Sequence, residues 1–321
     1  MIVSRGPSVV PRGALAFGIQ LPIQAQSSLF AEPWEATATP DDLAAIARAA
    51  DEHGFLYVAV CDHVAIPRRL AAAMGTTWYD SVATLSWLAA ATTRVRLLSH
   101  VYNLAYRHPL VTAKAFATLD RLSAGRVILG VGAGHVADEF AGLGLDFARR
   151  GRMLDDAIEV VDAALRTEFP TVANDSFTVD GQLGLAPRPV QDPRPPLWVG
   201  GSSPAAVRRA ARLGDGWLPQ GTPLDQLPPL VELLRTERAA AGATQPCDIG
   251  AITDWLHLGQ PTWDVGRPCR AGTPTRLAEH LRRYRDVGVD HLQVRFPSRS
   301  PVELIDQIAA FGSEVGPLLA P

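Results

Sequence analysis

The chain has 321 residues, of which 47% are hydrophobic and 20% are charged, and its formal net charge is −3. This composition is typical of a globular protein, and it excludes a long disordered chain and a strongly basic surface for nucleic acid. The three cysteines, Cys61, Cys247 and Cys269, are too few and too far apart for a disulfide framework or a Cys-x-x-Cys metal site, so a cytoplasmic location is expected.

The start of the chain reads MIVSRGPSVVPRG, with two prolines and no continuous apolar stretch. We therefore predict a flexible tail over residues 1–14 and one domain over residues 15–321. Every apolar run in the chain is shorter than the ~18 residues that a membrane helix needs, so no membrane partner is expected.

Short apolar runs alternate with longer amphipathic runs through this domain, which indicates parallel strands joined by crossover helices. Two helix starts are readable, because Thr39 and Thr273 can act as N-caps and each precedes a proline. The eight predicted strands are residues 15–21, 55–61, 95–101, 126–132, 196–201, 216–220, 249–258 and 291–296. Their number and alternation with helices predict an α/β fold, a single (β/α)8 TIM barrel with insertion segments.

Two segments interrupt this alternation. Residues from about 166 to 195 are rich in proline, aspartate and glycine and lack a helical period, so we predict an insertion there. Residues 259–272 form a second long linker, which is compatible with a loop over the barrel mouth and equally with an ordinary surface loop.

Polar and glycine-rich residues follow four of the predicted strands, in the stretches CDHV, SHVYN, GVGAGHVADE and VGGSSP. Active sites of (β/α)8 barrels lie in the loops after the strands, so these stretches are expected to meet at one end of the barrel. His63, beside Asp62, can exchange a proton near neutral pH, although a hydrogen-bonded structural histidine is the competing interpretation. The chain contains no HxH or HExxH motif, and no metal site is predicted.

Two glycine-containing stretches are candidates for ligand binding. The stretch at residues 200–203 precedes a helix whose first N–H groups favour an anion such as phosphate, with a plain serine-capped helix as the alternative. The stretch GAGHVA at residues 132–137 matches a dinucleotide fingerprint, which makes a nicotinamide dehydrogenase one hypothesis. The next helical pattern begins only near residue 149, so this stretch better suits a glycine-lined seat for a planar ring.

The chain resembles the luciferase-like monooxygenase superfamily, whose barrels use FMN or the deazaflavin coenzyme F420. The resemblance covers residues 15–319 and rests on three stretches, which begin SAGRVILGVGAGHVADEF, PPLWVGGSSPAAVRRAARLG and GTPTRLAEHLRRYRDVG. It implies an oxidoreductase that transfers a hydride between coenzyme F420 and a small organic substrate. An FMN-dependent monooxygenase and a cofactor-binding barrel without turnover are the alternatives.

The resemblance also implies roles for individual residues. His63 would be the catalytic proton donor, and Asp62 would contact the region of the deazaflavin ring. A non-proline cis peptide bond between Ser99 and His100 would support that ring. The other cofactor-binding residues implied are Gly132, Ala133, Gly134, His135, Gly200, Gly201, Ser202 and Ser203.

Two further expectations concern His135 and the assembly. Relatives that reduce a sugar phosphate carry an acid where this chain has His135, so such a substrate is not expected; His135 is either a proton donor or a cap of its loop. The resemblance implies a homodimer, and residues 79–95 are apolar on more than one helical face. The only other partner expected is a small-molecule substrate, with no nucleic acid.

Overall fold

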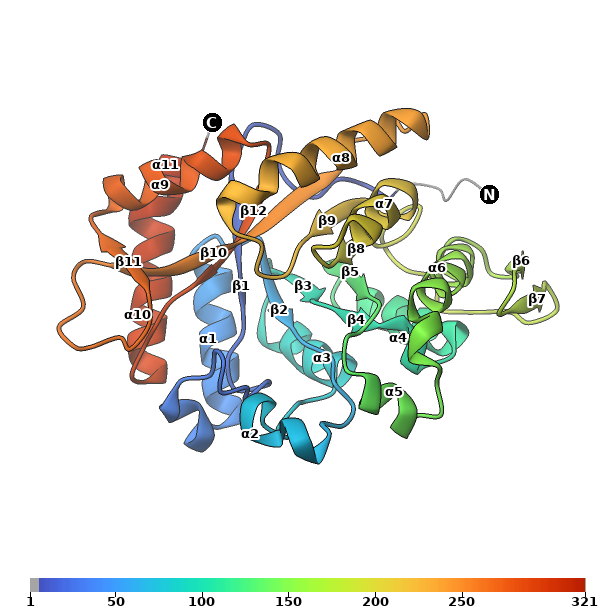
Figure 1. Ribbon diagram of the computed structural model, residues 1–321, viewed down its shortest axis with the longest axis horizontal. Helices are drawn as coiled ribbons and strands as arrows, with labels where there is room; N and C mark the ends of the chain where they lie inside the picture. Colours follow the sequence, from blue (N-terminus) through green and yellow to red (C-terminus); the bar gives the residue numbers. More distant parts are fainter. Residues whose placement is uncertain (1–5, 321) are drawn as a thin grey trace.

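Eight parallel strands close into a barrel in the computed structural model, which describes residues 6–320 (Figure 1). The barrel strands are β1 (Ala16–Gln20), β2 (Tyr57–Val60), β3 (Arg96–Ser99), β5 (Val127–Gly132), β8 (Leu197–Gly200), β9 (Gly216–Leu218), β10 (Asp248–Leu258) and β12 (His291–Arg295). They pair in this order, and β12 pairs with β1 to close the ring. The predicted strands and the (β/α)8 barrel are confirmed.

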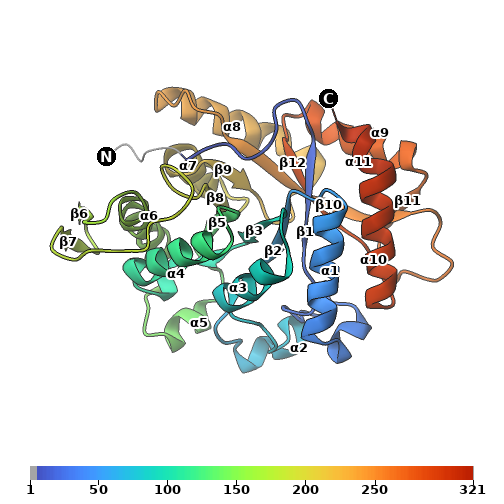
Figure 2. The same cartoon turned by 180° about the vertical axis from the view of Figure 1, so that it is seen from behind.

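Helices surround this barrel, as the view from behind shows (Figure 2). Thr39 and Thr273 accept hydrogen bonds from the backbone N–H groups of Asp42 and Arg276, which confirms both predicted helix starts. The longer helices are α1 (Pro40–Glu52), α3 (Ser81–Ala91), α4 (Pro109–Leu122), α6 (Arg150–Arg166), α7 (Pro204–Leu213), α8 (Leu227–Ala240), α9 (Pro274–Asp286) and α10 (Pro301–Ala310).

Shorter elements occupy the connections. They are η1 (Pro33–Thr37), η2 (Arg68–Leu70), α2 (Ala71–Met74), β4 (Tyr102–Asn103), η3 (Leu104–Tyr106), α5 (Ala137–Gly142), η4 (Phe147–Arg149), β6 (Thr171–Ala173), β7 (Thr178–Asp180), η5 (Leu224–Gln226), β11 (Cys269–Gly272), η6 (Phe311–Val315) and α11 (Gly316–Leu319). The antiparallel hairpin of β6 and β7, which comes between α6 and β8 in the chain, projects outward from the barrel beside α6 (Figure 2). The linker at residues 259–272 ends in β11, which pairs with β10.

The sequence analysis did not predict the short helix α5. We expected no helix before about residue 149, yet α5 begins at Ala137, directly after the glycine-rich stretch. Its six residues are too few for a helical period to be visible. The closed barrel also contradicts the nicotinamide dehydrogenase hypothesis, because a dinucleotide fingerprint requires an open doubly wound sheet.

The N-terminal segment is attached to the barrel where we expected a flexible tail. The backbone N–H of Gly6 donates to Asp215 at 2.6 Å, and the Ser8 hydroxyl donates to Asp248 at 2.5 Å. Val10 is buried and packs into the interior of the barrel. The expectation is therefore wrong for residues 6–10, and residues 1–5 lie outside the described part of the chain.

A buried ion cluster holds the amino end of the barrel together. Arg194 is fully buried, and its guanidinium contacts Asp162 at 2.6 Å and Asp215 at 2.5 Å. Asp215 also accepts the N–H group of Leu197. One cluster thus joins α6, the start of β8, the turn before β9 and the N-terminal segment. Among residues 6–320, no helix has both the length and the apolar character needed to cross a membrane.

Candidate active site

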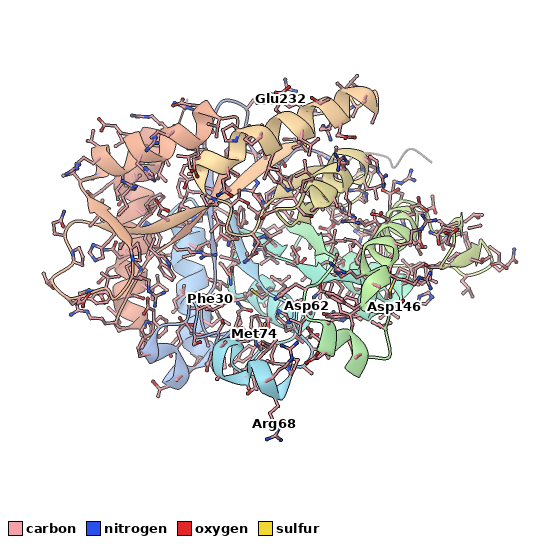
Figure 3. The ribbon with its side chains drawn as sticks, viewed as in Figure 1. Phe30, Asp62, Arg68, Met74, Asp146 and Glu232 are labelled. Carbon is pink, nitrogen blue, oxygen red and sulfur yellow. The ribbon has the colours of Figure 1, made fainter. Side chains whose placement is uncertain are left out.

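The carboxyl ends of the barrel strands form the mouth of the barrel. In Figure 1, the segments that carry η1, α2 and α5, which follow β1, β2 and β5, lie together along the lower edge of the molecule. Figure 3 labels Phe30 and Asp62 on two of these connections, in the lower half of the view above Met74 and Arg68. The polar stretches that follow separate strands in the sequence are therefore brought together, as expected.

His63 is held at the mouth by a buried carboxylate. Its Nδ1 lies 2.8 Å from an oxygen of Glu139, whose side chain is fully buried. The other oxygen of Glu139 accepts the N–H groups of Val64 and Ala65 at 2.6 and 3.1 Å. Burial opposes ionisation of Glu139, but the bonds from His63 and the backbone outweigh it and hold the pKa of this carboxyl below its usual value.

Three aromatic rings surround this pair. The hydroxyl of Tyr106 donates to Glu139 at 3.0 Å, and burial together with that carboxylate raises the pKa of Tyr106. The ring of Trp78 meets His63 edge-on at 4.4 Å between centres, and His135 meets it at 5.5 Å. Desolvation and the neighbouring charge of His63 lower the pKa of His135. Which role His135 plays, donor or cap, stays a prediction.

Protein donors surround the carboxylate of Asp62 at the end of β2. Its two oxygens receive both terminal nitrogens of Arg107 at 2.6 and 2.9 Å, and Asp62 is 3% exposed. It also accepts the backbone N–H of Asn103 and the hydroxyl of Ser81. These protein donors hold the carboxylate and fix the loop that carries His63, and the expected contact of Asp62 with the cofactor stays a prediction.

The cis peptide bond lies one residue later than expected. It joins His100 and Val101, not Ser99 and His100. The hydroxyl of Ser99 donates to the carbonyl of Gly130 and accepts its N–H group, so Ser99 stays in the strand ladder and the chain departs afterwards. His100 lies buried inside the barrel, where desolvation lowers the pKa of its ring to about 4.

The position of the Val101 side chain explains why two of the predicted cofactor-binding residues are glycine. A Cβ at Gly132 would lie 2.4 Å from one Val101 methyl, and a Cβ at Gly200 would lie 2.3 Å from the other. Val101 therefore sits between the ends of β5 and β8 and presents an apolar surface at the mouth. Gly134 needs its glycine for a different reason, since its φ is +73°. Ala133 is partly buried against the core.

The start of α7 follows directly on β8. Ser203 is the N-cap of this ten-residue helix and accepts the N–H of Ala206 at 3.2 Å. The hydroxyl of Ser202 donates to the carbonyl of Gln220, and the carbonyl of Gly201 accepts the indole N–H of Trp217. The loop at residues 200–203 is thus a rigid helix start at the mouth, the type of site at which anions bind.

A cavity of about 50 Å³ lies on the opposite side of the mouth, at the ends of β1 and β12. The residues lining it are apolar and aromatic, apart from a few polar side chains that include Gln20, Glu32 and Arg295. Gln20 donates to the sulfur of Cys61 at 3.1 Å, and Gln293 donates to Gln20. These contacts link the cavity to the end of β2, two residues before His63.

Several site residues escaped the sequence analysis. Glu139 stands 76 positions after His63, and Arg107 stands 45 positions after Asp62, so neither pairing has a local signal. Arg295 is the last residue of a predicted strand, and nothing in the sequence separates it from a surface arginine. Within residues 6–320, no group of three or more histidine, cysteine and acidic residues is arranged to hold a metal ion.

Comparisons with known proteins match residues 15–253 to the family described as luciferase-like monooxygenase. An uncharacterised protein of Mycobacterium tuberculosis is 33% identical over 183 residues, which are 56% of this chain and 61% of that protein. The match thus spans about three fifths of that relative's length. An F420-dependent glucose-6-phosphate dehydrogenase of Nakamurella multipartita is 28% identical over 87% of this chain and 93% of its own.

Solved structures share the fold. An F420-dependent secondary alcohol dehydrogenase in complex with an F420-acetone adduct has a TM-score of 0.76 at 19% identity, covering 96% of this chain and 100% of its own. A riboflavin lyase with modified FMN and the substrate riboflavin has a TM-score of 0.80 at 17% identity, covering 96% and 93%. At these identities the likeness shows the barrel fold alone.

Proposed function

The chain belongs to the luciferase-like monooxygenase family, and from this premise we propose that it is an oxidoreductase that transfers a hydride between coenzyme F420 and a small organic substrate. The observation that carries the proposal is the contact between His63 and the buried Glu139 at the mouth, beside the glycine-containing loops. The F420-dependent relative from Nakamurella multipartita supports this choice of cofactor.

The residues at the mouth fit a deazaflavin. The Val101 side chain packs against Gly132 and Gly200 and offers an apolar surface at the ends of β5 and β8. The capped start of α7 at Ser203 suits the phosphate of the cofactor tail, because backbone N–H groups and the helix dipole favour an anion. When bound, the deazaflavin would supply or accept the hydride.

His63 would exchange the proton that accompanies hydride transfer. When Nδ1–H of His63 donates to Glu139, the proton-exchanging atom is Nε2. Glu139 would fix the orientation of the ring, and its bonds from Val64 and Ala65 keep it in place. The ring of Trp78, which meets His63 edge-on, further restricts the orientation of the His63 ring. The chain therefore contributes orientation and a proton at a defined atom.

An FMN-dependent activity is the second candidate function. It is favoured by the shared fold of the riboflavin lyase, whose structure contains modified FMN. A start of α7 that suits a phosphate would serve either cofactor, since both carry one. The barrel alone therefore does not choose between them, and cofactor binding has to be measured.

Location and assembly form part of the proposal. A chain with only three cysteines suits a reducing cytoplasm, and we place the enzyme there. We also propose a homodimer that uses α3, whose Trp87 is 41% exposed. Light scattering on the purified protein would report a mass near twice 34.4 kDa if this assembly forms.

The test of the proposed function is a cofactor titration followed by a substrate screen. We expect purified protein to bind coenzyme F420 at least tenfold more tightly than FMN, and to oxidise its reduced form with an organic acceptor such as an enone or an imine. His63→Ala should leave F420 binding within twofold and reduce turnover by about 10²–10⁴-fold. Preferential binding of FMN, or full turnover by His63→Ala, would contradict the proposal.

A further inference from the structure

Arg295 is a cation at the mouth that has no carboxylate partner in the part of the chain that the structure describes. It is the last residue of β12 and is partly buried. Within residues 6–320, no carboxylate lies within 4.0 Å of its guanidinium, whereas three other arginines at the mouth, Arg69, Arg107 and Arg267, have an acidic partner. Burial lowers the pKa of Arg295, which is the sign of a cation removed from water.

The neighbours of Arg295 do not neutralise its charge. Cys61 is an ionisable neighbour of Arg295, but burial raises the pKa of this thiol to about 12, so it stays neutral at physiological pH. Gln20 already donates to that sulfur. Arg267, which is itself a cation, does not neutralise Arg295 either; both guanidinium groups lie over the ring of Trp255, at 4.4 Å for Arg267 and 5.9 Å for Arg295.

Two buried acids line the same cavity, and both have other partners. Glu35 accepts the N–H groups of Ile23 and Glu32 at 2.7 Å, one on each oxygen. Glu32 contacts Arg267 at 3.4 Å. Burial raises the pKa of both carboxyls above their usual value. The positive charge of Arg295 is therefore left for a ligand.

We propose that Arg295 binds a carboxylate carried by the organic substrate. One unpaired guanidinium matches a singly charged carboxylate, which it can hold through two parallel N–H donors. Phosphate would need more positive charge than one arginine supplies, because Arg267 already contacts Glu32. The inference rests on the proposed function, since it assigns the substrate class of the same site.

The shape of the cavity supports a headgroup site. About 50 Å³ admits a carboxylate with a short carbon chain, and Phe30, Trp34 and Trp255 provide apolar walls for that chain. The contacts from Gln20 to Cys61 connect this site to β2, which carries His63 just beyond its end. A substrate anchored at Arg295 would therefore extend its reducible carbon across the mouth toward His63.

The test compares butyrate with butyramide, which have nearly the same shape but differ in charge. Saturation-transfer NMR on the purified full-length protein would measure both affinities without added cofactor, and separately after saturation with coenzyme F420. We expect butyrate to bind at least tenfold more tightly than butyramide. Arg295→Met should remove this difference, Arg295→Lys should keep part of it, and Arg299→Met, which alters an exposed arginine paired with Glu303, should keep all of it.

Each result decides the inference. Equal binding of the two probes to the wild type, no binding of butyrate, or unchanged butyrate binding by Arg295→Met would overturn it. Inorganic phosphate that competes more strongly than butyrate would overturn the carboxylate assignment. The comparison of probes on the wild type remains valid even if Arg295→Met fails to fold. If the wild-type protein does not bind coenzyme F420 but still binds butyrate more tightly than butyramide, the proposed cofactor is refuted and the carboxylate site stands.

Discussion

Two arginines at opposite ends of the barrel differ in the partners that the chain supplies. Arg194, at the amino end, is fully buried and contacts Asp162 and Asp215. Arg295, at the mouth, is partly buried and has no carboxylate partner among the described residues. Because a buried charge is costly unless it is paired, the pairing of Arg194 serves folding, whereas the unpaired Arg295 is explained by a ligand.

The ion pairs at the amino end of the barrel and those at the mouth also differ in what they hold in place. At the amino end, the ion cluster joins four segments of the chain and none of its oxygens faces the mouth. At the mouth, the ion pairs orient particular groups: Arg107 fixes Asp62, and Glu139 fixes His63. Ion pairs at the amino end should therefore affect stability, and those at the mouth should affect activity.

The largest expected effect comes from substituting each arginine by methionine. Arg194→Met would leave two buried aspartates without their shared cation, so we expect the free energy of unfolding to fall by about 3–5 kcal/mol. Arg295→Met removes a cation that has no ion pair, so stability should fall by less than about 1 kcal/mol or rise. Urea unfolding of both variants measures the difference.

Arg299→Met serves as the matched surface control for both variants. Arg299 is exposed and pairs with Glu303 one helical turn away, so its loss should change stability by about 0.5 kcal/mol or less. If Arg194→Met and Arg295→Met destabilised the protein equally, the contrast between the two ends would fail. The assignment of Arg295 to a ligand would then lose its main support.

The next effect in size concerns Glu139. Glu139→Gln keeps the shape of the side chain but turns an amide NH₂ group toward either His63 or the N–H groups of Val64 and Ala65. We expect turnover to fall about 10–100-fold while the dissociation constant for coenzyme F420 changes by less than twofold. Stopped-flow measurement of hydride transfer gives the effect on turnover, and a fluorescence titration gives the dissociation constant for coenzyme F420.

Tyr106→Phe is the matched control, since it removes one hydrogen bond to Glu139 and leaves the carboxylate in place. It should cost about 0.5–1.5 kcal/mol in the barrier to turnover at most. A Glu139→Gln variant with wild-type turnover, or one that loses cofactor binding and turnover together, would show that Glu139 does not position His63.

How far the sequence could predict this molecule depends on the range of each interaction. Strand and helix patterns are local, so the barrel strands and the caps at Thr39 and Thr273 were found. The position of His63 at the mouth followed because parallel strands end on the same side. The partners of His63 and Asp62 lie 76 and 45 positions away, and no local pattern indicates such pairs.

One error in the site has a specific physical cause. The cis bond was placed one residue early because the exchange of two hydrogen bonds between Ser99 and Gly130 cannot be seen in the sequence. Gly132 has a structural reason that the sequence does not show, since its missing side chain accommodates Val101, a residue of another strand end; its contact with a cofactor stays a prediction. The unpaired state of Arg295 is a property of the assembled mouth, and only the folded chain reveals it.

The smallest predicted effect tests the amino end through pH. Desolvation and the nearby charge of Asp248 raise the pKa of Asp290 to about 6, with Arg235 opposing this rise. The folded state therefore binds a proton more tightly than the unfolded chain, so the stability this provides is present below about pH 4 and is lost as pH rises through about 6. Because Asp290 keeps some access to solvent, we expect the loss to be about 1–2 kcal/mol.

Asp290→Asn should still accept the N–H of Ile249 and should remove this loss, which makes the variant more stable than the wild type at pH 7 and nearly equal to it at pH 4. Thermal unfolding from pH 4 to pH 8, with the exposed Asp306→Asn as control, measures the effect, and parallel pH profiles for the wild type and Asp290→Asn would exclude Asp290 as its source.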